Sequence, residues 1–148
     1  MIVCRQTDQI PWGWFLGDCA VSGGTLDSYL KEAMCFSGGK ICIRLRPISV
    51  IFPLPCSTGV GIRPSQEKIR YLCSNHSAHF SDRLMTNYLT YKTNEGLFCL
   101  LFDTEDSLCR KMELLKALRI PMVLVEDQKL FHLLKNESAP QKAGRRNA

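Results

Sequence analysis

Residues 96–128 read GLFCLLFDTEDSLCRKMELLKALRIPMVLVEDQ. The apolar runs at 97–102 and 122–125 have the length and composition of strands that are buried on both faces. Between them, apolar residues recur at helical spacing until Pro121 prevents the helix from continuing. This order of elements predicts a βαβ unit, in which two parallel strands are joined by a right-handed crossover.

The rest of the chain is consistent with the same class of fold. Thr25 is a candidate N-cap for a helix, Gly38 ends that helix, and Ser65 is a candidate N-cap for another. Apolar periodicity then predicts the remaining elements, which are strands at 1–4, 41–45 and 48–52 and helices at 26–36, 80–93 and 128–136.

Together these patterns predict one α/β domain over residues 1–135. It should contain a mixed sheet of four to five strands, a C-terminal βαβα unit and helices on both faces of the sheet. The polar residues 136–148 contain no core-forming pattern and are predicted to be a disordered basic tail.

Composition favours an intracellular protein. The chain has 148 residues, of which 45% are hydrophobic and 22% charged, as in ordinary globular proteins. No apolar run is long enough to cross a membrane, and the first residues do not resemble a secretion signal. The eight cysteines are scattered without a CxxC pair, so we expect them to be reduced and mostly buried, in a cytoplasmic or nuclear protein.

Positive charge gathers in the middle of the chain. Residues 37–92 contain eight basic side chains and two acidic ones, within a chain whose net charge is +5. This imbalance favours a non-catalytic binding subunit or adaptor that contacts RNA or DNA and works with other protein subunits of a complex. The candidate contacts are Arg44, Arg46, Arg63, Lys68 and Arg70.

A resemblance agrees with that hypothesis. The pattern of LFCLLFDTED, a helix, and RIPMVLVED is similar to that of a family of small RNA-binding proteins of the ribosome. The resemblance implies a related fold for this third of the chain, and it assigns no residue a role.

Two hypotheses from other classes remain open. The aromatic residues Trp12, Trp14 and Phe15 are typical anchors of a pure protein-protein interaction module. Acidic residues that follow the two apolar runs could instead hold Mg²⁺ in a nuclease or phosphotransferase. The candidate metal ligands are Asp103, Asp106, Glu126 and Asp127.

We prefer an interpretation without a metal or other cofactor, in which Asp103 or Thr104 caps the helix that follows the first run and Asp127 caps the last helix. Glu105 and Asp106 would then complement the positive end of the helix dipole. If Asp103 only caps a helix, Asp103→Asn should cost about 0.5 kcal/mol, because asparagine caps almost as well. Cys73 and His76 could form a nucleophile and base, and His79 could join them around zinc, but no family signature surrounds them and we assign no catalytic residue.

Overall fold

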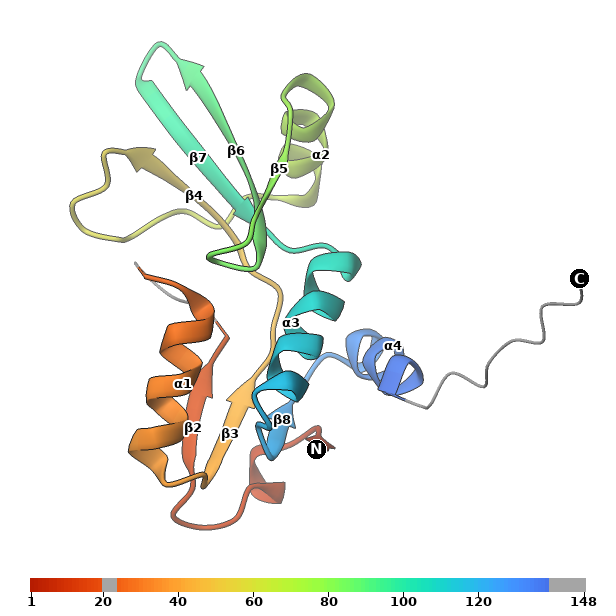
Figure 1. The fold of residues 1–148 in the computed structure, drawn as a ribbon. Coiled ribbons are helices and arrows are strands. Elements are labelled where there is room, and N and C mark those ends of the chain that lie inside the picture. Colours follow the sequence, from red (N-terminus) through yellow and green to blue (C-terminus); the bar gives the residue numbers. More distant parts are fainter. Residues whose placement is uncertain (20–23, 139–148) are drawn as a thin grey trace, which may run out of the picture.

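Two sheets, each with its own helices, make up the computed structural model, which describes residues 1–19 and 24–138 (Figure 1). Sheet A is entirely parallel and has the strand order β1-β8-β3-β2. Its strands are β1 (Ile2–Cys4), β2 (Phe15–Asp18), β3 (Ile41–Arg44) and β8 (Met122–Leu124).

Sheet B is antiparallel, has the order β4-β7-β6-β5, and lies beyond the carboxyl ends of β2 and β3 in Figure 1. Its strands are β4 (Ser49–Leu54), β5 (His79–Ser81), β6 (Thr86–Thr93) and β7 (Gly96–Phe102). The helices are α1 (Leu26–Ser37), α2 (Gln66–Asn75), α3 (Glu105–Ala117) and α4 (Gln128–Ser138), with a short 3-10 turn η1 (Thr7–Gln9).

The predicted α/β class is confirmed, and the arrangement of its strands differs from the expectation. The C-terminal order β7-α3-β8-α4 is present, but β7 pairs with β4 and β6 while β8 pairs with β1 and β3. The two apolar runs therefore belong to different sheets. β8 is buried along its whole length and β7 only in part, and an apolar run does not specify which sheet a strand joins.

Local capping chemistry explains where the helices begin and end. The Thr25 side chain accepts a hydrogen bond from the Ser28 backbone at 3.1 Å, as predicted, and α1 ends at Gly38 with a positive φ of 62°. Ser65 caps α2 in the same way. Helix α4 extends to Ser138, so the predicted disordered tail starts within a helix, and its remainder lies outside the described residues.

The helix predicted over residues 80–93 is wrong. This segment forms the end of β5, a turn at Met85 with a φ of 55°, and strand β6. Leu89 and Tyr91 are buried at a spacing of two residues, and β6 pairs along its whole length with the apolar strand β7. Pairing with β7 and the high strand propensity of TNYLTYKT outweigh the helical spacing of Phe80 and Leu84.

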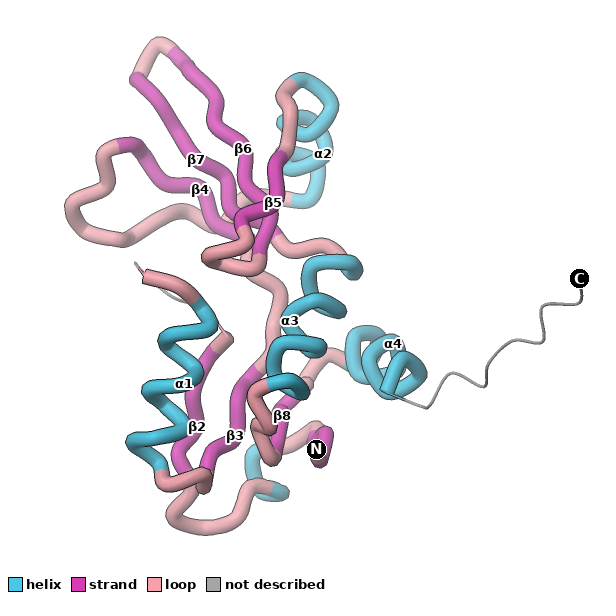
Figure 2. Tube along the Cα trace, viewed as in Figure 1, coloured by secondary structure: helices cyan, strands magenta, loops and turns pink. Residues whose placement is uncertain are grey.

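Helices cover only one face of sheet A. Leucines of α1, α3 and α4 pack against Ile41, Ile43 and Val123, and Figure 2 shows α1 and α3 on the same side of β2 and β3. The alternate residues of these strands point to the other face of sheet A. There, no described helix residue belongs to the buried cluster. That cluster consists of Cys4, Cys42, Met122 and Leu124, with Ile10 and Trp14 packed against it. Among the described residues, no helix combines the length and apolarity that a membrane span requires.

Candidate functional site

Charged side chains from three parallel strands meet at the carboxyl end of sheet A. Asp18 is the last residue of β2 and pairs in register with Arg44, the last residue of β3. The Nε atom of Arg44 lies 3.3 Å from Oε2 of Glu126, which follows β8, and Nε of Arg46 lies 3.6 Å from Oδ1 of Asp18. We call these four residues the carboxyl rim.

The carboxyl rim keeps hydrogen-bonding capacity that its own residues do not use. Oδ1 of Asp18 and Nε of Arg44 are buried atoms without a hydrogen-bond partner among the described residues. Their ion pairs satisfy the distance for Coulombic attraction but not the geometry of a hydrogen bond. A buried polar atom left without a partner costs about 1–3 kcal/mol, so a polar ligand that bonds to these atoms would recover free energy.

A concave region lies on sheet B, on the face opposite α2. It is a hollow of about 320 Å³, and Cys99 and Leu101 of β7 form part of its floor. The other lining residues are Phe52, Phe80, Ser81, Leu84 and Tyr88. The hollow is therefore aromatic and apolar, and its lining includes no charged side chain. The carboxyl rim is the better candidate for a site that recognises a polar ligand.

Asp103 does not cap helix α3 and is not placed to bind a metal. The N-cap is Thr104, which forms a reciprocal capping box with Ser107. Each oxygen of Asp103 already accepts two hydrogen bonds from protein groups, and one of these donors is the Nζ atom of Lys111, 2.7 Å away. Both side chains of this ion pair are completely buried.

The other acidic candidates do not join Asp103. Asp103 follows β7 of sheet B, whereas Glu126 and Asp127 follow β8 of sheet A. Asp127 caps α4 through a 2.8 Å hydrogen bond from the Leu130 backbone, as predicted, and Asp106 pairs with Arg110. The described residues contain no group of three acidic, cysteine or histidine side chains with the geometry of a metal site.

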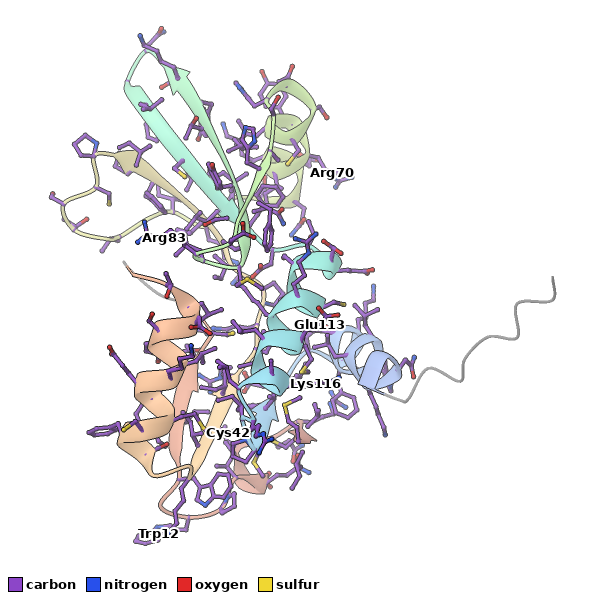
Figure 3. All side chains as sticks on the ribbon, viewed as in Figure 1. Trp12, Cys42, Arg70, Arg83, Glu113 and Lys116 are labelled. Carbon is purple, nitrogen blue, oxygen red and sulfur yellow. The ribbon has the colours of Figure 1, made fainter. Side chains whose placement is uncertain are left out.

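The basic candidates are divided between the two sheets. Arg44 and Arg46 belong to the carboxyl rim and lie beside carboxylates. Lys68 and Arg70 lie on α2, against sheet B, and Lys68 is 5.9 Å from the ring centroid of Tyr91. Figure 3 labels Arg70 on α2 in the upper part of the molecule, away from Cys42 in sheet A. The fifth candidate, Arg63, lies in the loop between β4 and α2.

The aromatic candidates lie on and before β2. Trp12 is fully exposed, whereas Trp14 is partly buried against Cys4 and Cys42. Phe15 makes an edge-on contact with Phe36 of α1, with 6.2 Å between the ring centroids. Trp12 and Phe15 are therefore available to a partner, while Trp14 contributes to packing.

The Cys73 and His76 pair does not have the properties of a nucleophile and its base. Cys73 is an exposed residue of α2, and partial burial of its sulfur raises the pKa of the thiol, which lowers the fraction of reactive thiolate. The ring of His76 packs against Tyr91, and the ring of His79 packs against Tyr88. The structure therefore gives both histidines a role in packing.

The buried cysteines make stability depend on pH. Desolvation raises the pKa of Cys19 from 9.0 to about 12, so between these values the unfolded chain releases a proton that the folded chain retains. This contribution to stability is complete below pH 9 and is lost as pH rises toward 12.

We expect the free energy of unfolding to fall by up to about 1.4 kcal/mol per pH unit for this thiol above pH 9. Urea denaturation at pH 8 and pH 10.5 would measure the decline. Cys19→Ala should make it shallower, whereas Cys35→Ala, at an exposed position, should leave it unchanged. An identical decline in the parent and in Cys19→Ala would contradict this prediction.

Arg44, Arg46 and Glu126 were candidate residues of two different hypotheses, and Asp18 was in neither. The available signal was the short apolar stretch FLG that ends in an aspartate, which resembles the end of the run at 97–102. The overlapping sequence PWGWF (residues 11–15) is typical of a turn, so strand β2 was not predicted.

Comparisons with solved structures identify proteins with a similar fold. The chain resembles a sporulation-specific glycosylase of Bacillus subtilis, with a TM-score of 0.57, 16% identity, and coverage of 84% of this chain and 51% of that one. A chitinase of Chromobacterium violaceum gives a TM-score of 0.56 and 15% identity over 93% of this chain and 45% of its own. The spore cortex-lytic enzyme SleL of Bacillus megaterium gives a TM-score of 0.55 and 13% identity over 83% of this chain and 33% of its own.

No protein-family model and no curated protein matches the sequence. The chain spans about half or less of the length of the structures that it resembles. These likenesses overturn the hypothesis of a nucleic-acid-binding adaptor or complex subunit, because the shared fold is that of carbohydrate-processing enzymes. The residues that suggested nucleic acid are paired with acids or divided between two sheets, which explains the error. The chain therefore shares its fold with a part of each of these structures.

Proposed function

We propose that this chain binds a structural polysaccharide of the chitin type, and that it does so at the carboxyl rim. The fold that it shares with a glycosylase, a cortex-lytic enzyme and a chitinase supports the class of ligand. In parallel α/β sheets, ligands bind beyond the carboxyl ends of the strands, which is where the rim lies.

The observation that carries the proposal is the pair of unsatisfied atoms, Oδ1 of Asp18 and Nε of Arg44. A sugar hydroxyl both donates and accepts hydrogen bonds. It can donate to the carboxylate of Asp18 while it accepts from the guanidinium of Arg44, which lies opposite on the neighbouring strand. Both bonds involve a charged protein group, and such bonds are about twice as strong as those between neutral groups.

Hydrolysis of a glycosidic bond requires an arrangement of carboxyl groups that the carboxyl rim alone does not provide. Glycosidases place two carboxyl groups on either side of the scissile bond, about 5–10 Å apart. In the rim, Arg44 pairs in register with Asp18 and lies beside Glu126, so a guanidinium lies between the two carboxylates. The geometry therefore supports recognition of the polysaccharide, with no acid or nucleophile assigned to these residues.

Asp18→Asn should weaken binding of a hexamer of β-1,4-linked N-acetylglucosamine at least about ten-fold, because the amide removes the charge that strengthens the hydrogen bond. Isothermal titration calorimetry would measure the dissociation constants of parent and variant. The matched control is Asp27→Asn, which changes an exposed aspartate that is paired with Lys31 on α1.

Binding that is equal in the parent and in Asp27→Asn, and weaker in Asp18→Asn, would support the proposal. If the parent does not bind the hexamer at millimolar concentration, or if both variants lose affinity equally, the carboxyl rim is not a polysaccharide site.

A further inference from the structure

Sheet A is uncovered at both edges. Its outermost strands are β1 and β2, and among residues 1–19 and 24–138 no other strand pairs with their outer edges. Parallel sheets ordinarily have both faces covered, and free strand edges are ordinarily protected. Among the described residues, the helices cover one face of sheet A, and Ile10 and Trp14 pack against the buried cluster on the other face.

Exposed apolar side chains are concentrated at these edges. Ten large hydrophobic residues are exposed in the part of the chain that the structure describes. Six of them lie on or next to β1, on β2, in the connection between these strands, or beside Phe15 on α1. These six are Met1, Ile2, Trp12, Phe15, Leu16 and Phe36. Phe36 is 84% exposed and Ile2 62%, which makes this surface a candidate interface.

The faces of the two edges also match. Ile2, Met122, Cys42 and Leu16 are successive partners across the four strands, so they form one row that points to the face without helices. Ile2 ends that row at one edge and Leu16 ends it at the other, and both are exposed. A strand placed beside either edge would extend an apolar row.

A second copy of the chain fits both edges at once. A closed parallel barrel has about eight strands, with helices only on the outside and side chains filling the interior. Sheet A has four parallel strands with helices on one face. A two-fold axis along the barrel axis, from which the strands are tilted, places β2 of each copy beside β1 of the other, and neighbouring strands remain parallel.

We propose that two copies of this chain associate through the outer edges of β1 and β2 and close sheet A into one parallel barrel. A second copy supplies as many strands as the first, and four strands from each copy make the eight of a closed parallel barrel. The carboxyl rims of both copies then surround the same end of the barrel. The inference depends on the fold and on the exposed edges, and it stands whether or not the rim binds a polysaccharide.

Sedimentation equilibrium at tens of micromolar protein should give about twice the 16.8 kDa mass of the chain. Leu16→Lys and Ile2→Glu should each raise the dissociation constant of the dimer at least about a hundred-fold, because each buries an unpaired charge at both seams. Far-UV circular dichroism would establish that the variants are folded. Ile2 is more exposed than Leu16, so Ile2→Glu provides the test if Leu16→Lys does not fold.

Leu97→Lys is the matched control, because Leu97 is 45% exposed but lies on β7 of sheet B. It should leave the dimer intact. A monomeric parent, a folded Ile2→Glu or Leu16→Lys variant that dimerises as tightly as the parent, or dissociation caused by Leu97→Lys would each overturn the proposal.

Discussion

Asp103→Asn is expected to lower the free energy of unfolding by about 3–5 kcal/mol, because it leaves the ammonium group of Lys111 buried without a counter-charge. Asp103 also accepts hydrogen bonds from the backbone of Ile48 and from Thr86 and Ser107, so its carboxylate connects β6 and the segment before β4 with α3. Urea denaturation followed by circular dichroism would measure the loss.

Asp106→Asn is the matched control, on the first turn of the same helix. Asp106 is 76% exposed and pairs with Arg110 across one helical turn, so its replacement should change stability by no more than about 0.5 kcal/mol. Combining Asp103→Asn with Lys111→Met should recover part of the loss, since it removes the uncompensated charge. A stability of Asp103→Asn within about 1 kcal/mol of the parent would show that the pair does not hold the two sheets together.

Features that depend on neighbouring residues could be predicted from the sequence. Thr25, Ser65 and Asp127 cap helices as expected, because a cap requires only a suitable side chain two or three residues before a backbone donor. The strand at 41–45 and the helix that ends before Pro121 are local in the same sense. The partition of strands into two sheets was not predictable, because it depends on pairings between distant segments.

The role of Asp103 had a signal in the sequence that was not used. Lys111 occupies the apolar stripe formed by Leu108, Met112 and Leu115, where a lysine is almost never found without a buried partner. An acid just before the helix is the nearest candidate for that partner. Interpreting Asp103 as a cap satisfied the helix terminus but left Lys111 unexplained.

The carboxyl rim shows why the candidate site could be predicted only in part. Its members lie at positions 18, 44, 46 and 126, and they meet because β2, β3 and β8 are neighbours in a parallel sheet. The basic residues alone indicated an anionic partner, since the acids that neutralise Arg44 and Arg46 are distant in sequence. Charge counted along a chain overestimates the charge of a surface when the counter-charges come from other strands.

Leu100→Ala is expected to cost about 2–5 kcal/mol and to shift the unfolding of both sheets together. Leu100 is completely buried in the cluster formed by Leu72, Leu89 and Phe102, so truncation leaves a cavity within sheet B. Trp14 packs against the core on the opposite face of sheet A, far along the chain from this cavity. Trp12 is fully exposed in the folded chain, so the change in tryptophan fluorescence on unfolding comes mainly from Trp14 and reports sheet A, while circular dichroism reports the whole chain.

We expect the two sheets to unfold in one transition because of the Asp103–Lys111 pair. Lys111 is a buried residue of α3, and Asp103 is its only buried counter-charge among the described residues. Unfolding of sheet B would remove that counter-charge. Both signals should therefore shift to the same lower urea concentration in Leu100→Ala. Leu97→Ala, at an exposed position of the same strand, should change the free energy of unfolding by less than about 0.5 kcal/mol. If circular dichroism shifts while Trp14 fluorescence keeps the parental midpoint, the two sheets unfold independently, and the buried ion pair contributes to sheet B alone.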